Sequence, residues 1–198
     1  MGDGKRILLH HIDDIVRVHP HPSQFHLASN LTASKYRLRG VNQIKVDMLY
    51  IFPTELEARR FRELCPEQQI VISGVGMVAT AATIMRLVQH GEIRPNDVVV
   101  LAGVAGAYGD YPAVGSVVEV TEERCSELPE RFQRRYTNRA LTTLNAVVSN
   151  SVHGKGVEPQ GAQIENMEGA ALFALAREYG FGVAEIRAIS NRVGEEFA

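Results

Sequence analysis

The 198-residue sequence predicts an α/β fold with a mostly parallel sheet that is covered by helices on both faces. Three observations support this fold class. Short apolar runs, which are typical of buried strands, alternate with segments of helical periodicity. Glycine-rich or polar stretches follow these runs, as is usual at the carboxyl ends of parallel strands. The hydrophobic fraction of 45% and the charged fraction of 22% are those of a globular protein that can bury a core.

Apolar runs predict the strands in chain order. The first run, Met48–Phe52, is rich in aromatic residues and is stopped by Pro53. The last run is followed by a polar pair, Asn191 and Arg192, which we interpret as a turn. Further strands are predicted at 70–73, 98–106, 117–121, 144–149 and 183–190.

Three helices are predicted between these strands, and each has an apolar stripe at helical spacing. The first begins after Thr54, the second ends at Gly91, and the third covers 165–180. Glycine is favoured just beyond a helix end. The predicted stripes are Ala58, Phe61, Leu64 and Cys65; Val78, Ala81, Met85 and Val88; and Ala171, Leu172, Leu175 and Tyr179.

The first 46 residues differ in composition from the rest. Five of the seven histidines lie here, among prolines and a basic stretch at 35–39, and no hydrophobic period persists. His19 and His21 have the ligand chemistry that suits zinc, copper or nickel, but no cysteine or carboxylate set accompanies them. We therefore predict no metal site. We expect residues 1–46 to be an N-terminal extension that packs poorly or is disordered, before a domain at 47–198.

Charge and hydropathy argue against several classes of partner. The net charge of −2 and the pI near 6.4 do not suit a nucleic-acid or acidic membrane surface. No apolar run reaches the roughly 18–20 residues that a bilayer span needs. The opening residues lack the features of a signal peptide. The two cysteines, Cys65 and Cys125, have no metal-ligand spacing. We expect a cytoplasmic protein.

Four blocks, in order along the chain, resemble the nucleoside phosphorylase and nucleosidase superfamily. They are PTELEA (53–58), SGVGMVATAAT (73–83), LAGVAGAYGDYPAVGSVVEV (101–120) and IENMEGAALFALAREYGFGVAEIRAISN (164–191). Within the superfamily, the variants ENMEGAA, RAISN and GVAGAY are most similar to futalosine hydrolases. The resemblance implies a three-layer α/β/α sandwich with a central mostly parallel, mixed sheet. Family members usually continue past the last block, so it also implies a domain that lacks the terminal helix.

The resemblance implies an N-glycosyl hydrolase of a 6-oxopurine nucleoside. The expected substrate is futalosine, with release of hypoxanthine in menaquinone biosynthesis, and the expected assembly is a homo-oligomer without metal or cofactor. Three alternatives stay open: a methylthioadenosine/adenosylhomocysteine nucleosidase, a purine nucleoside phosphorylase, and a non-catalytic nucleoside-binding paralogue. Phosphorylases use arginines to bind phosphate, and Arg59, Arg60 and Arg86 do not match that pocket. Water is therefore the favoured nucleophile.

Glu57 is the candidate for handling the attacking water, because a carboxylate can orient a water molecule and accept its proton. Thr54 and Glu57 also form a Thr-x-x-Glu pattern, which is typical of a capping box at a helix start. The spacing alone favours the capping interpretation, whereas the resemblance favours catalysis. Glu55 is the weaker candidate.

Glu168 is the candidate for holding the ribose, because one carboxylate can accept hydrogen bonds from both vicinal hydroxyls. Its alternative interpretation is a solvated glutamate favoured by the dipole at a helix start. Met167 is expected to pack against the sugar or the base, and its alternative role is to fill the core.

Asn191 is the candidate for recognising the base. Adenine-specific relatives carry aspartate at this turn, whereas the amide of asparagine donates to acceptors such as N7 and O6 of hypoxanthine. Glycines at 103 and 106 are expected to let the backbone approach the ligand. The resemblance places further residues around the substrate: Val104, Ala105 and Gly106, and, through main-chain groups, Asn150, Ser151 and Val152.

Overall fold

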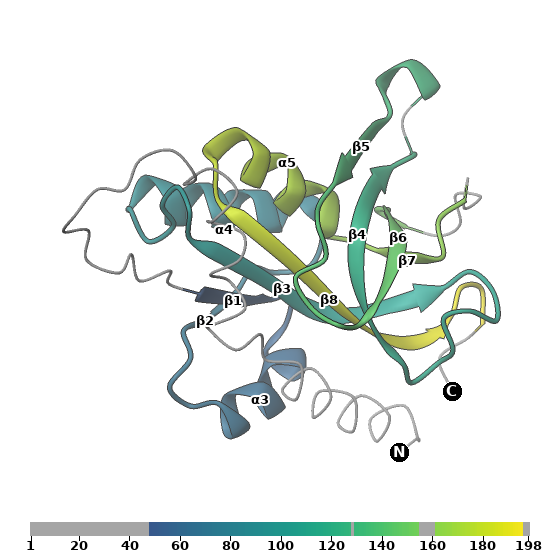
Figure 1. Cartoon of the computed structure of the whole chain (residues 1–198), viewed down its shortest axis with the longest axis horizontal. Coiled ribbons are helices and arrows are strands. Elements are labelled where there is room, and N and C mark those ends of the chain that lie inside the picture. The colour runs from purple at the N-terminus through teal and green to yellow at the C-terminus, as the bar shows by residue number, and fades with distance from the viewer. Residues whose placement is uncertain (1–47, 128, 155–160, 196–198) are drawn as a thin grey trace, which may run out of the picture.

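The structure is a computed structural model of the chain, and it describes residues 48–127, 129–154 and 161–195 (Figure 1). The expectations for residues 1–46, including the histidines considered as metal ligands, lie outside these ranges. The described elements, in chain order, are β1 (Met48–Phe52), α3 (Glu55–Leu64), β2 (Ile70–Ile72), α4 (Met77–Gln89), β3 (Val98–Ala107), β4 (Val117–Cys125), the 3-10 helix η2 (Glu130–Phe132), β5 (Arg134–Thr137), β6 (Asn145–Ser151), β7 (Ile164–Asn166), α5 (Gly169–Tyr179) and β8 (Gly182–Arg192).

The strands form one mixed sheet in the described part of the chain. β1 pairs in parallel with β2 and β3, and β3 pairs in parallel with β8 along its whole length. β8 then pairs antiparallel with β4, β4 pairs in parallel with β6, and β6 pairs in parallel with β7. β7 returns to pair antiparallel with the end of β3. These pairings close a ring of strands beyond the open part of the sheet, and β5 extends β4 at the edge.

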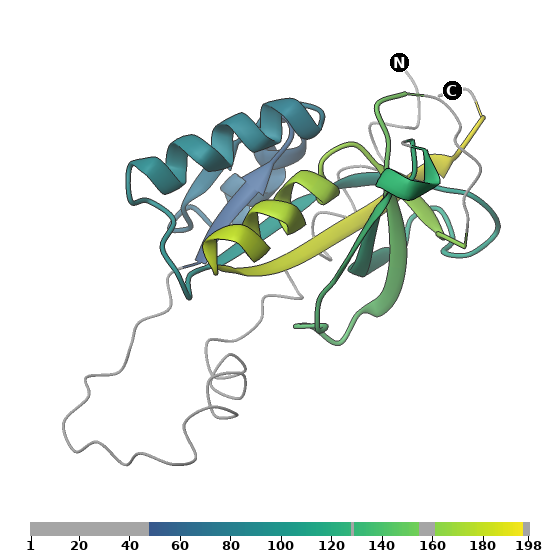
Figure 2. The same cartoon turned by 90° about the horizontal axis from the view of Figure 1, so that it is seen from above.

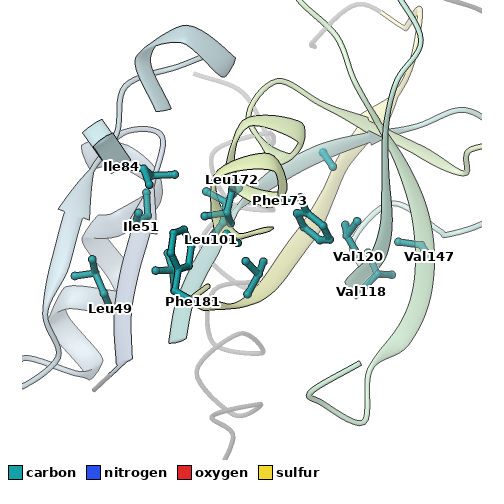
Figure 3. Packing of buried hydrophobic residues seen from close by; sticks show 14 of the residues in the cluster. Leu49, Ile51, Ile84, Leu101, Val118, Val120, Val147, Leu172, Phe173 and Phe181 are labelled. Carbon is teal, nitrogen blue, oxygen red and sulfur yellow. The ribbon is translucent and has the colours of Figure 1, made fainter. Parts of the chain in front are cut away.

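Helices cover both faces of the open part of the sheet, which confirms the predicted α/β fold. Figures 1 and 2 show α4 and α5 side by side on one face and α3 on the other. The core under α4 and α5 includes Ile51, Leu101, Leu172 and Phe173 (Figure 3). On the α3 face, the rings of Phe52 and Phe61 lie 5.4 Å apart. Burial of these apolar surfaces provides the main stabilisation of the three layers.

The predicted stripe of α4 is wrong. The buried side chains of this helix are Thr80, Ile84 and Leu87, whereas Val78 is 76% exposed. The predicted and the observed stripe both have helical spacing. The observed stripe faces the sheet, where Ile84 and Leu87 pack with apolar side chains of β1, β3 and α5. The predicted stripe of α3 is also wrong at its end, because Leu64 is 41% exposed.

The third predicted helix begins four residues too early. Residues 164–166 form β7 rather than helix, because their backbone pairs with β6 and with the end of β3. Helix α5 then starts at Gly169 with Glu168 as its N-cap. Asn191 and Arg192 are likewise not a turn, since β8 continues through them and stays paired with β3 after a one-residue shift in register between Ala105 and Gly106. Long-range pairing decided these boundaries.

Candidate functional site

Glu57 lies at the start of α3, where the chain leaves β1, and is 8% exposed. Its amide donates to the Thr54 hydroxyl (3.2 Å), so the threonine caps the helix as predicted. The Glu57 carboxylate accepts from the Thr54 hydroxyl (2.6 Å) and from the Val104 amide of β3 (3.1 Å). Glu57 therefore joins the helix start to β3. An ionised carboxylate has about four acceptor positions, so further hydrogen bonds remain open to it.

Gly103 of β3 lies close to two charged groups. A Cβ at this position would stand 2.9 Å from Nη1 of Arg187 and 3.0 Å from Oε1 of Glu57. Its missing side chain therefore leaves room for the Arg187 guanidinium and the Glu57 carboxylate. The expectation that this glycine lets the backbone approach the substrate stays a prediction.

Glu168 is buried rather than solvated, at 4% exposure. Its Oε1 accepts from the Gly76 amide before α4 (2.9 Å), and its Oε2 accepts from Nη2 of Arg187 (3.2 Å). The carboxylate is thereby held in place by charge-assisted hydrogen bonds.

Arg187 binds Glu168 and lies near Glu57, although sequence reasoning did not single it out. Its side chain is fully buried, its Nη1 donates to the Val104 carbonyl (3.2 Å), and its Nη2 also donates to Oδ1 of Asn166 (3.1 Å). Burial lowers the pKa of Arg187, but the carboxylates of Glu185 and Glu168 more than offset this and raise it. The guanidinium therefore stays cationic. A signal was present in the sequence: an arginine inside an apolar strand must be paired, because lone buried charges are very costly.

Asn191 lies beside Gly106 at the end of β8, and the two residues are register partners. A Cβ at Gly106 would stand 3.6 Å from Nδ2 of Asn191. The Asn191 side chain accepts from the Ser190 hydroxyl (2.8 Å) and donates to the Arg192 carbonyl (2.9 Å). Asn191 of β8 thus pairs with a residue of β3 that is three positions beyond Gly103, the glycine that Glu57 and Arg187 approach.

The other predicted site residues fall into two groups. Val104, Ala105 and Gly106 follow Gly103 on β3, and Gly106 pairs with Asn191 of β8. Met167 is partly buried next to Glu168. Residues 150–152 lie at the end of β6, separated from β3 by β7, and all three are buried.

Polar groups at 150–152 are engaged with protein. Asn150 accepts from the Ser126 hydroxyl (2.7 Å), and Ser151 accepts from the Ala170 amide of α5 (2.8 Å). The Val152 amide donates to the Asn166 carbonyl (2.9 Å). The contribution of these three residues to substrate binding stays a prediction.

Replacement of Gly103 by alanine tests the close approach over β3. The added Cβ would push apart the Arg187 guanidinium and the Glu57 carboxylate, both of which are held by other bonds. We expect kcat to fall about 10- to 100-fold, because displacements of about 1 Å in an active site have effects of this size. Gly109→Ala is the control, since a Cβ there would meet no described atom within 4 Å. Similar rates for both variants would contradict this role for Gly103.

Within residues 48–127, 129–154 and 161–195, no group of three or more His, Cys, Asp or Glu side chains is arranged to hold a metal ion. No helix in these ranges is long and apolar enough to span a membrane.

The chain is similar to a known protein in sequence and to several solved structures in fold. No protein-family model matches the chain. The futalosine hydrolase of Thermus thermophilus is 30% identical over 157 residues, which covers 62% of this chain and 68% of that protein. The methylthioadenosine/adenosylhomocysteine nucleosidase of Campylobacter jejuni superposes with a TM-score of 0.64 at 12% identity, covering 77% of this chain and 89% of that one. A mutant futalosine hydrolase of Helicobacter pylori strain 26695 superposes with a TM-score of 0.61 at 13% identity, covering 74% and 86%.

The TM-scores show that the chain shares the overall fold of these nucleosidase structures, and the relative in sequence is a futalosine hydrolase. Together with the carboxylates gathered around Arg187, these similarities define an N-glycosyl hydrolase of the nucleosidase class. The chain belongs to the nucleoside phosphorylase/nucleosidase superfamily and is similar to futalosine hydrolase within it.

Proposed function

We propose that this protein hydrolyses the N-ribosidic bond of a 6-oxopurine nucleoside, with futalosine as substrate and hypoxanthine as the released base, in menaquinone biosynthesis. The observation that carries the proposal is the placement of Glu57 and Glu168 around one buried arginine, with an asparagine at position 191. The similarity to the Thermus thermophilus enzyme supports futalosine as the substrate.

In this proposal Glu57 acts on the water. The Val104 amide and the Thr54 hydroxyl hold its carboxylate, and a remaining lone pair accepts a hydrogen bond from water aimed at C1′. As the C1′–N9 bond breaks, its electron pair leaves with the purine, and the water oxygen bonds to C1′ while Glu57 accepts the water proton. Arg187 stands beside this carboxylate and helps to fix its position.

Glu168 holds the ribose. Gly76 and Arg187 each occupy one acceptor position on its carboxylate, and the other positions face the vicinal hydroxyls of the sugar. The negative carboxylate also favours the positive charge that develops on the ribose ring in the transition state.

The substrate class is tested by incubating the full chain with futalosine, inosine and methylthioadenosine, each with and without phosphate, and identifying the base and sugar released. We expect hypoxanthine from futalosine without phosphate. Adenine release from methylthioadenosine at a higher kcat/KM would instead establish the adenine-nucleoside alternative, which the structural relatives also represent. Cleavage only with phosphate would establish a phosphorylase, and no cleavage of any substrate would favour a binding protein.

Replacement of Asn191 by aspartate tests the choice of base. An aspartate at this position exchanges an amide donor for an acceptor, which leaves N7 and O6 of a 6-oxopurine without their partner. We expect the ratio of kcat/KM for futalosine to that for methylthioadenosine to fall about 10- to 100-fold. The matched control is Asn145→Asp, at the exposed start of β6. An unchanged ratio in Asn191→Asp would show that this residue does not select the base.

A further inference from the structure

Two buried glutamates, Glu123 of β4 and Glu185 of β8, meet beneath the start of α5, and the proposed chemistry uses neither. Both side chains are fully buried. A Cβ on Gly169, the first residue of α5, would stand 2.6 Å from Oε2 of Glu185 and 2.8 Å from Oε2 of Glu123. The bare α-carbon of this glycine therefore lets the two carboxyl groups converge on the same spot.

The hydrogen bonds around Glu123 show which oxygen is free to carry a proton. The Ser151 hydroxyl accepts from the Ala170 amide, so its own hydrogen is donated to Oε1 of Glu123 (2.6 Å). Asn166 accepts through Oδ1 from two amides at the start of α5 and from Arg187, so its Nδ2 is a donor. This Nδ2 lies 3.1 Å from Oε1 and 3.2 Å from Oε2 of Glu123, and 2.6 Å from the Ser149 hydroxyl. Oε1 of Glu123 accepts from both Ser151 and Asn166, whereas Oε2 lies beside Oε2 of Glu185 at Gly169. A hydroxyl oxygen can accept from Asn166 and still donate, so a proton on this carboxyl belongs on Oε2.

Glu185 presents the complementary acceptor. Its Oε1 accepts from Nε of Arg187 (2.8 Å), whereas its Oε2 is buried and has no hydrogen-bond partner among the described residues. A buried acceptor without a donor is costly. A proton on Oε2 of Glu123 would supply the missing donor.

The charged groups around the two glutamates also favour a proton on Glu123. The described charged groups that face one another here are Glu123 from β4, Glu185 and Arg187 from β8, and Glu168 before α5. Arg187 contacts both Glu185 and Glu168, so no cation contacts Glu123 directly in the described part of the chain. Burial raises the pKa of Glu123 well above its usual range, and the neighbouring charge of Glu185 raises it further. Burial also raises the pKa of Glu185, but Arg187 opposes this rise.

We propose that Glu123 and Glu185 share one proton across Gly169, as an acid–carboxylate pair that holds Arg187 in position behind Glu57 and Glu168. The pair is a positioning device and does not touch substrate. Loss of the proton puts two negative charges side by side, and Glu185 then moves away from Glu123 and turns the guanidinium that it binds. The effect on catalysis rests on the proposed nucleosidase function, whereas the shared proton does not.

The proton is detected by infrared spectroscopy of the full chain at neutral pH, as the C=O stretch of a buried protonated carboxyl group. We expect the band in the wild type and its loss in Glu123→Gln. Glu165→Gln is the matched control, because the pKa of Glu165 is also raised by burial and its Oε2 is also buried without a partner among the described residues. No band in the wild type, or a band lost in Glu165→Gln and retained in Glu123→Gln, would overturn the proposal.

Proton linkage provides a second measurement. The folded-state pKa of Glu123 lies above its unfolded value, so the folded protein binds an extra proton and wild-type stability falls as pH rises from about the ordinary carboxyl range toward the folded pKa. We expect unfolding to release about one proton more in the wild type than in Glu123→Gln across this window. If Glu123→Gln does not fold, the wild-type band is followed during a pH titration, and it must disappear together with kcat.

The infrared band and the cleavage assay distinguish failure of the shared proton from failure of the proposed nucleosidase function. If the chain cleaves no nucleoside but the band depends on Glu123, the shared proton stands and the proposed function fails. If the chain cleaves futalosine but the wild type has no band, the shared proton fails and the function stands. If the shared proton and the nucleosidase activity are both present, we expect kcat to decline as pH rises through the folded-state pKa of Glu123, with KM little changed. We expect Glu123→Gln to remove that decline. A decline that persists in Glu123→Gln would contradict the positioning role of the pair.

Discussion

Replacement of Glu57 by glutamine is expected to lower kcat for hypoxanthine release by about 10²- to 10⁴-fold, the usual contribution of a positioned general base. Glutamine has nearly the same shape, and its carbonyl can still accept from the Val104 amide, so the fold is expected to persist. What it loses is the ability to accept a proton from water. Single-turnover measurement of base release at saturating futalosine separates this loss in chemistry from any change in binding.

Glu55→Gln is the matched control for this experiment. Glu55 lies on the same first turn of α3, but its side chain is exposed and contacts Arg62 (3.2 Å). We expect wild-type kcat and an unchanged melting temperature for this variant. A large loss in Glu55→Gln with little loss in Glu57→Gln would assign the water to the other glutamate.

Replacement of Arg187 by methionine is expected to lower the free energy of unfolding at neutral pH by about 3–5 kcal/mol, the typical cost of removing one partner from a buried ion pair. Methionine fills much of the space but leaves Glu185 and Glu168 without their cation. Urea denaturation monitored by circular dichroism measures the loss.

The deficit of Arg187→Met should also depend on pH. Arg187 lowers the pKa of Glu185, so its removal raises that folded-state pKa further above the unfolded value. A group shifted in this way destabilises the fold above its unfolded pKa, and protonation relieves the cost. We therefore expect the deficit to shrink as pH falls from neutral toward the ordinary range of glutamate. A deficit that is constant with pH would show that lost packing, not charge, is responsible.

Arg192→Met provides the control for charge burial. Arg192 pairs with Asp110 at 2.7 Å, a shorter contact than either ion pair of Arg187, but both side chains are largely exposed. Exposed pairs contribute at most about 1 kcal/mol. Equal losses in the two variants would mean that burial does not set the strength of these pairs.

Much of the fold followed from local patterns. The apolar runs that became β1 and β3 are buried on both faces in the structure, which explains why their sequences are continuously apolar. Thr54 was predicted as a cap and does cap α3. Gly91 was predicted just past α4 and does adopt a positive φ there. Each of these features depends on residues close together in the chain.

Other elements depend on partners that are distant in the sequence. β5 carries two arginines among its four residues and shows no apolar pattern, yet it pairs with β4 at the edge of the sheet. β7 is three residues long and continuous with a helical pattern, and it is a strand because β6 and β3 lie on either side of it. No local propensity distinguishes such segments from loop or helix.

The sequence by itself determined the α/β layers and the positions along the chain of the strands that carry the site. Through its resemblance to nucleosidases, it also determined the candidates Glu57, Glu168 and Asn191. Only the tertiary structure decided that Arg187 binds Glu168 and Glu185, and that Glu123 meets Glu185 over Gly169. The physical reason is that charged residues in apolar strands must be paired once buried, but their partners come from β4, β8 and the start of α5. Their identity depends on how the sheet closes, which no local pattern encodes.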